Sequence, residues 1–358
     1  MRTQRSAEEE RTEEIAGGEG VRGARKLLVR LALLGGLVLL TGAAIGRYDS
    51  RAGEDNYLAA VLEKDRIIRN TASPKIILVG GSNLAFGIDS KAMQDSLGLR
   101  VVNMGLYAKL GLKYMLAQVR PYIGQGDVIL VVPEYDQFYG DFANGDNTLN
   151  TALLYAPADR IRDFMRSYSI ADVVLRPRAE NVRRSFLRAV AAAAGKEDAF
   201  FPPDTNPVYN RRSFNKYGDV VSHLGRKGMN PDSIFVKPLP PMKDFNKGTL
   251  ADLNGIADEA KEKHAHAYFL FPSYIQTSYD INVAAIDSLK NRLVAGMRMP
   301  IIGSAKDFVY PGIYFFDTRF HLNEEGRRLR TVRLIEMLRK RGERDGWIAP
   351  VVTLLDGQ

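Results

Sequence analysis

The stretch KIILVGGSN, residues 75–83, decides the fold class. It begins with a short apolar run, which is typical of a strand buried on both faces of a parallel sheet, and it continues into a glycine pair that permits a sharp turn. Similar apolar runs follow at 100–103, 128–132 and 267–271, with a weaker one at 313–316. Helical patterns lie between several of them, at 90–97, 110–123, 250–263, 281–294 and 324–341. This alternation predicts an α/β fold in which helices cover both faces of a parallel sheet.

The composition excludes several classes of protein and of functional site. The chain has 358 residues, 45% of them hydrophobic, which is enough for one large domain or two ordinary ones. It contains no cysteine, which excludes disulfides, thiolate metal sites and cysteine nucleophiles. The formal net charge of +8 is spread along the chain, so it favours anionic surroundings and gives no reason to expect nucleic-acid binding.

An apolar segment near the N-terminus predicts a single-pass membrane anchor. Residues 27–46 read LLVRLALLGGLVLLTGAAIG, close to the ~20 residues that a helix needs to cross a bilayer. The excess of basic residues before this segment predicts a cytoplasmic N-terminus, with the main domain periplasmic or extracellular. A cleaved signal peptide is the alternative, because the residues at 42–44 are small.

The rest of the chain divides by composition. Residues 1–26 predict a mobile cytoplasmic tail, 47–73 a linker helix, 74–342 the α/β domain and 343–358 a C-terminal tail. The regular alternation stops between about 140 and 250, which indicates an insertion. Its first part, 156–196, is rich in arginine and predicts basic helices. Its second part, 197–247, is rich in Pro, Asn, Asp and Gly and predicts a surface loop or lid.

Two distant segments carry candidate catalytic residues. Ser82 follows the first strand, at the end of a parallel sheet where ligands bind, and Gly81 beside it allows close approach of a substrate. A serine nucleophile needs a base oriented by a carboxylate, and Asp317 and His321 in DTRFHLN supply such a pair. Each segment alone has a plainer interpretation, Ser82 as a helix cap and 317–323 as a helix start.

These motifs together resemble the SGNH hydrolases, also called the GDSL esterase/lipase superfamily. The shared features are GGSN after the first strand, NMG at 103–105 after the second, and D-x-x-x-H-L-N before the last helix. The resemblance covers residues 74–342 and implies a three-layer, flavodoxin-like SGNH fold. It implies Ser82 as nucleophile, Asp317 and His321 as the rest of a triad, and backbone N–H groups of Ser82 and Gly105 as an oxyanion hole. It implies no metal and no cofactor.

Two features depart from the family pattern. The third block of the family has G-x-N-D, whose asparagine is an oxyanion donor, whereas here the strand at 128–132 runs into PEYDQ at 133–137. Ionised Glu134 donates poorly, so Asn83 or Tyr135 is a candidate donor, and losing one donor costs about 10²- to 10³-fold in rate. The Asp and His are also four residues apart, where the family has three.

The departures, the anchor and the insertion look most like the membrane-anchored SGNH-like proteins of cell-envelope polymer modification, which include those of alginate O-acetylation and teichoic-acid D-alanylation. That likeness implies a serine esterase or O-acyltransferase acting on acyl esters, acetyl esters above all, of a cell-envelope polysaccharide. The implied partners are the polysaccharide or acyl ester, a membrane-bound O-acyltransferase, and membrane lipid through the anchor. The alternative is a non-catalytic scaffold that binds polysaccharide or docks on the acyltransferase.

Overall fold

The structure is a computed structural model that describes residues 25–30, 33, 35–36, 56–196 and 206–349. The chain divides into two compact units, one made of residues 1–53 and 181–202, the other of 54–180 and 203–358. The second unit contains the sheet and all the candidate catalytic residues.

The core of the second unit is a parallel sheet of four strands, β1 (Lys75–Gly80), β2 (Arg100–Asn103), β3 (Val128–Val132) and β4 (His266–Phe269). Their order is β2-β1-β3-β4, and β1 lies between β2 and β3 with Ile76 opposite both Val101 and Val128. Every residue of β1 and β3 is buried, as expected for strands covered on both faces. The α/β fold predicted from the sequence is confirmed, and the order matches the first four strands of the flavodoxin-like arrangement.

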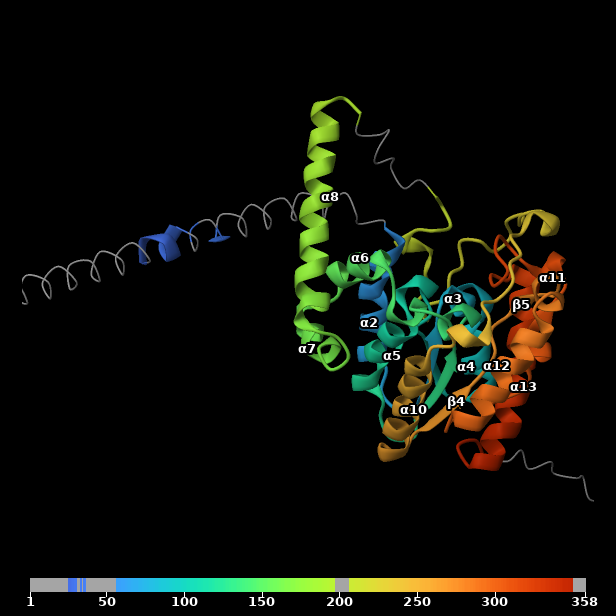
Figure 1. Cartoon of the computed structure of the whole chain (residues 1–358). Coiled ribbons are helices and arrows are strands. Elements are labelled where there is room, and N and C mark those ends of the chain that lie inside the picture. Colours follow the sequence, from blue (N-terminus) through green and yellow to red (C-terminus); the bar gives the residue numbers. More distant parts are fainter. Residues whose placement is uncertain (1–24, 31–32, 34, 37–55, 197–205, 350–358) are drawn as a thin grey trace, which may run out of the picture. The chain divides into compact units, whose positions relative to one another are not determined.

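Helices cover both faces of this sheet (Figure 1). The connections β1 to β2 and β2 to β3 run in opposite directions, so right-handed crossovers place their helices on opposite faces. Helices α5 (Leu112–Val119) and α10 (Lys247–Glu262) pack together on one face, and α4 (Ser90–Leu97) and α13 (Glu324–Asp345) pack together on the other. Asn323 caps α13 by accepting a hydrogen bond from Gly326 N, and two glutamates follow it in the first turn.

The fifth predicted strand, 313–316, is wrong. A 3-10 turn, Gly312–Tyr314, occupies its first half, directly after Pro311, whose ring fixes φ and removes an N–H that a strand would need. A separate sheet of two short strands, β5 (Tyr274–Ile275) and β6 (Val309–Tyr310), lies earlier in the chain. On the side of β4 away from β3, the described residues form a single parallel bridge, between Phe269 and Ile301.

The predicted insertion begins with helices α6 (Asn147–Tyr155) and α7 (Ile161–Phe164), then a π-helical turn (Ala171–Leu175) and α8 (Arg176–Ala193). The arginine-rich stretch 156–196 therefore contains helices, α7 and α8, as the composition predicts.

The second part of the insertion is described from residue 206, and it is loop with short 3-10 turns. The prediction that it is a surface loop or lid is wrong where the segment turns inward, because Val208 and Val220 lie in the hydrophobic core, although most of its described residues are exposed or half-buried. Asp219 is fully buried and accepts hydrogen bonds from Ser90 Oγ, at 2.5 Å, and from Arg327 Nη2, at 3.2 Å. These polar bonds anchor the loop inside the domain.

The predicted linker is also part of the domain. Its described residues form a 3-10 turn, Tyr57–Ala60, and α2 (Val61–Arg69). The buried Lys64 Nζ donates to Asn103 O at 2.8 Å and to Gly105 O at 2.6 Å, beyond the end of β2. Burial of this ammonium against backbone carbonyls joins α2 to the sheet.

The predicted C-terminal tail, 343–358, begins inside helix α13, and Trp347 Nε1 donates to Tyr268 Oη of β4 at 2.9 Å. The start of that segment therefore belongs to the domain, and 350–358 lie outside the described residues.

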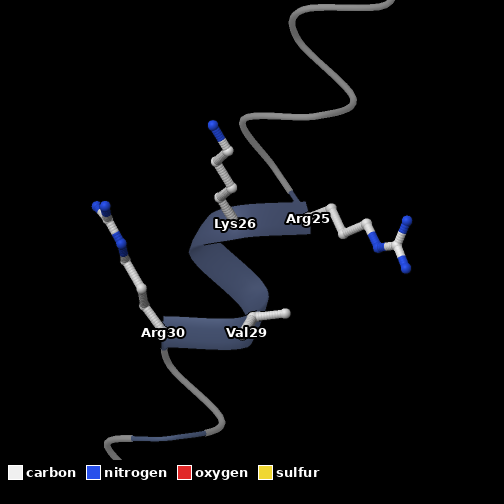
Figure 2. Close-up of a pocket in the computed structure, with 4 residues that line it drawn as sticks. All are labelled: Arg25, Lys26, Val29 and Arg30. Atoms are coloured by element: carbon white, nitrogen blue, oxygen red, sulfur yellow. The ribbon is translucent and has the colours of Figure 1, made fainter.

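Most of the predicted anchor, 27–46, and the tail before it lie outside the described residues. In the part of the chain that the structure describes, no helix combines the length and the apolar character needed to span a membrane. A hollow on the short helical segment 25–30 is lined by Arg25, Lys26, Val29 and Arg30 (Figure 2). All four come from one stretch of six residues, and none is a candidate catalytic residue.

Candidate active site

Ser82 is the first residue of α3 (Ser82–Gly87), directly after β1. The glycines before it are required by close contacts. A Cβ on Gly80 would lie 2.5 Å from Val132 O, and one on Gly81 would lie 2.8 Å from Glu134 Oε1 and 3.1 Å from Ala108 Cα. The glycine pair therefore lets β1, β3 and the turn after β2 approach one another closely around the serine.

The Ser82 hydroxyl has Glu134 as its partner. Ser82 Oγ donates to Glu134 Oε1 at 3.3 Å, and the backbone N–H of Asn83 donates to the same oxygen at 3.2 Å. Glu134 stands just beyond β3 and is 5% exposed. Burial raises the pKa of Glu134, although the nearby His321 and the bond from Asn83 oppose that shift.

Asp317 and His321 form the predicted pair. His321 Nδ1 lies 2.8 Å from Asp317 Oδ1. The hydroxyl of Tyr209 donates to the other carboxylate oxygen, Asp317 Oδ2, and lies 3.1 Å from His321 Nδ1. Burial alone would raise the pKa of Asp317, but the bonds from His321 and Tyr209 outweigh it and hold that pKa below its ordinary value. The carboxylate is therefore ionised and able to orient the imidazole.

Phe86 connects the pair to the serine. Its ring stacks on the His321 imidazole with centroids 4.2 Å apart and planes 4° apart. Phe86 follows Ser82 by four residues on α3, so the two side chains share one face of that helix. The structure thus brings Ser82 and His321 into one neighbourhood. Within the described residues no hydrogen bond joins them, because the hydroxyl is directed to Glu134.

The predicted backbone donor Gly105 is already occupied. Its N–H donates to Asn103 Oδ1 at 2.9 Å, and its carbonyl accepts from Lys64. The local turn after β2 is held by these two bonds. Gly105 N–H is therefore not free for a substrate in this structure.

Of the two predicted side-chain donors, Asn83 is already bonded and Tyr135 is buried. Asn83 Nδ2 donates to Val132 O at 3.1 Å, while Asn83 Oδ1 accepts from Arg330 Nη2 at 3.2 Å. Tyr135 is fully buried with its ring 4.9 Å from that of Tyr274, and its hydroxyl has no partner among the described residues. Neither side chain is available to a substrate without rearrangement.

Three supporting residues were not predicted from the sequence. Tyr209 comes from the insertion. Arg330, fully buried on α13, also donates to Asn83 O at 2.7 Å and so fixes the first turn of α3. His223, 1% exposed, lies against Phe86 with ring centroids 4.9 Å apart, and burial lowers its pKa to about 4. Of these three residues, Arg330 is the one that the sequence could have indicated, because it lies on the side of the last helix that faces the core.

An ion-pair cluster joins the third block to the last one. Asp136 accepts from Arg319 Nη2 at 2.7 Å and pairs with Lys237 Nζ at 2.8 Å. Asp136 is two residues after Glu134, and Arg319 is two residues before His321. The cluster therefore ties together the two segments that flank the candidate nucleophile.

Among residues 25–30, 33, 35–36, 56–196 and 206–349, no three or more His, Asp or Glu side chains are grouped as metal ligands. No family model matches this chain, and no curated protein is similar enough to it to count as a relative. The resemblance to SGNH hydrolases therefore stays a hypothesis, and we infer function from the geometry around Ser82.

Proposed function

We propose that the protein is a serine ester hydrolase or O-acyltransferase of SGNH type, with Ser82 as the nucleophile, His321 as the base and Asp317 as the orienting carboxylate. The observation that carries the proposal is the Asp317–His321 bond of 2.8 Å. This pair lies beside α3, the helix that begins at Ser82, because Phe86 of that helix stacks on the His321 imidazole. A nucleophile, an imidazole and a buried carboxylate in one neighbourhood are the parts that acyl transfer needs.

The proton route follows from the bonds of the imidazole. His321 Nδ1 is bonded to Asp317, which leaves Nε2 for proton transfer. Ser82 Oγ would form a bond to the acyl carbon while its proton passes to His321 Nε2. The alcohol then leaves with that proton, and water or a glycan hydroxyl releases the acyl group by the reverse sequence. Ser82 must first turn from Glu134 toward His321, a rotation consistent with the loose catalytic hydrogen bonds of many substrate-free sites.

The substrate and location remain proposals from the sequence. We infer a membrane-anchored, extracytoplasmic enzyme acting on acyl esters of a cell-envelope polysaccharide, beside a membrane-bound O-acyltransferase, from the apolar segment 27–46 and the family resemblance. The mechanism requires no metal or organic cofactor.

The test compares Ser82→Ala with wild type, using the full chain in detergent and p-nitrophenyl acetate as a short acyl ester. We expect Ser82→Ala to abolish turnover. Ser288→Ala is the matched control, because Ser288 is exposed on α12 (Val283–Gly296) and its one hydrogen bond within the described residues goes to Ala284 O of the same helix. If Ser82→Ala hydrolyses the ester as fast as Ser288→Ala, Ser82 is not the nucleophile.

A non-catalytic scaffold that binds polysaccharide is the second candidate. It is favoured by the bond from Ser82 to Glu134 and by the commitment of Gly105 N–H to Asn103. Reaction with a serine-directed fluorophosphonate separates the two candidates. Labelling of wild type that is lost in Ser82→Ala supports the enzyme, whereas a folded wild-type protein that does not label supports the scaffold.

A further inference from the structure

Glu134 is held against the candidate nucleophile by the sheet itself. Gly80 of β1 pairs with Val132 of β3, so the residues that follow these two strands emerge side by side. Glu134 Oε1 accepts hydrogen bonds from both the Ser82 hydroxyl and the Asn83 N–H, and Glu134 is 5% exposed. Its position depends on strand register and two hydrogen bonds, which makes it a fixed part of the site.

No cation is paired with this carboxyl group. Among the described residues Glu134 forms no ion pair: the nearby Arg319 is bound to Asp136, and Arg330 donates to Asn83. A buried carboxylate without a cation carries a large desolvation cost, whereas a neutral carboxyl group can accept through one oxygen and donate through the other. The raised pKa of Glu134, caused first by burial, agrees with the neutral form.

A donor is needed at this position. The oxyanion of a tetrahedral intermediate requires preorganised hydrogen-bond donors. Of the predicted donors, Gly105 N–H and the Asn83 amide are bonded elsewhere and the Tyr135 hydroxyl is buried away, so Ser82 N–H is left without a second donor beside it. Glu134 Oε2 is the oxygen left without a partner among the described residues, and the covalent geometry of the carboxyl group keeps it close to the Ser82 hydroxyl.

We propose that Glu134 is a catalytic residue that, as a neutral carboxyl group, donates a hydrogen bond from Oε2 to the oxyanion formed when Ser82 attacks an ester carbonyl. As the Ser82 Oγ–carbon bond forms, the carbonyl electron pair moves to oxygen and the Ser82 proton moves to His321. The Oε2–H bond is not broken. When the intermediate collapses, the electron pair returns to the carbonyl and the alcohol leaves with the proton from His321. The proposal rests on the proposed function.

The neutral carboxyl group of Glu134 stabilises the oxyanion, whereas its ionised form destabilises the oxyanion. A carboxylate at this place repels the oxyanion and binds the Ser82 hydroxyl more strongly, so it lowers the rate. We therefore expect the wild-type rate to fall as pH rises and Glu134 ionises.

The experiment measures kcat/KM for p-nitrophenyl acetate with the full chain between about pH 5 and 9. Glu134→Gln keeps an acceptor and a permanent N–H donor in nearly the same shape, so we expect it to stay within about tenfold of wild type and to lose the alkaline fall. Glu134→Ala removes the donor, and we expect a loss of about 10²- to 10³-fold. Thermal unfolding of each variant separates a folding defect from a catalytic one, and the near-isosteric Gln variant keeps the test valid if the Ala variant fails to fold.

Three results overturn the proposal: Glu134→Gln as inactive as Glu134→Ala, which would mean that the carboxylate is required; an alkaline limb unchanged by Glu134→Gln; or full activity in a folded Glu134→Ala. Failure of the proposed function is distinguishable, because it appears as activity that survives Ser82→Ala. An enzyme that depends on Ser82 but gives any of the three results refutes only the role of Glu134.

Discussion

Replacing Tyr209 with phenylalanine tests whether the insertion helps to hold the catalytic pair. The change removes only the hydroxyl that donates to Asp317 Oδ2 and lies 3.1 Å from His321 Nδ1. The ring contact with Phe86, at 5.6 Å between centroids, can remain. The contacts of Tyr209 go to Asp317, His321, Phe86 and Tyr57, and none of them reaches Ser82, so Tyr209 is a positioning residue.

The size of the effect follows from the bond that is lost. A hydrogen bond to a charged group contributes about 1.5–3 kcal/mol. If the loss appears in the transition state, where the imidazole carries a proton and depends most on Asp317, kcat falls about 10- to 100-fold. KM should change little. Because the bond from Tyr209 helps to hold the pKa of Asp317 down, its removal raises that pKa and moves the acid limb of the rate profile to higher pH.

The assay is ester hydrolysis by the full chain over a range of pH, and Tyr122→Phe is the control. Tyr122 also donates to a carboxylate, Asp65 Oδ1, at 3.1 Å, but Asp65 is bonded to Arg69 and Arg160 and has no contact with Asp317 or His321. We expect the control to lose stability without losing kcat. Equal kcat in Tyr209→Phe and Tyr122→Phe, with no displacement of the acid limb, would refute the positioning role.

Two further predictions concern stability. His223 has a pKa of about 4 when folded, against about 6.5 when unfolded, so the unfolded state binds more protons between these values and stability is lost as pH falls from about 6.5 toward 4. His223→Phe should reduce that acid loss by roughly 3 kcal/mol in urea unfolding, and an acid profile identical to wild type would contradict the assignment. Arg330→Met leaves the two Asn83 acceptors without their donor and should lower the free energy of unfolding by about 1–3 kcal/mol for each. Arg328→Met, on the exposed face of α13, should leave stability almost unchanged, and an equal loss of stability for both variants would contradict the role of Arg330.

The sheet could be predicted from the sequence because buried parallel strands are visible as uninterrupted apolar runs. The run at 75–79 matches β1, and the runs at 100–103 and 128–132 match β2 and β3. The weaker run at 313–316 follows Pro311, and its Phe315 pairs with Leu322 in an isolated antiparallel bridge. Ile313, within the turn, is 68% exposed, whereas Phe315 and Phe316 after it are buried, so an apolar run here does not form a strand buried along its whole length.

The positions of the three candidate catalytic residues in the chain could be predicted from the sequence, whereas the hydrogen bonds that they form could not. Ser82 stands at the start of α3, after β1, and Asp317 and His321 lie in the segment before α13, whose start is marked in the sequence by Asn323. The partner of the Ser82 hydroxyl depends on how β1 and β3 align, and Glu134 could be recognised in the sequence only as the absence of an asparagine. Local patterns identify the position of a side chain along an element, but a hydrogen bond requires the relative placement of two elements.

The second part of the insertion contributes residues to the candidate site, beside those that follow the strands of the sheet. Tyr209 bonds the Asp317 carboxylate, His223 lies against Phe86, and Asp219 accepts from both Ser90 and Arg327. These contacts reach β-strand connections and the last helix, so the loop is fixed at several independent points of the domain. Without this loop, Asp317 would lose its bond from Tyr209 and keep its bond to His321. A carboxylate held by that single hydrogen bond would then orient the imidazole. The orientation of the catalytic pair is therefore a property of the loop and the sheet together, which is why an irregular, proline-rich segment without any recognised motif carries a residue on which the proposed chemistry depends.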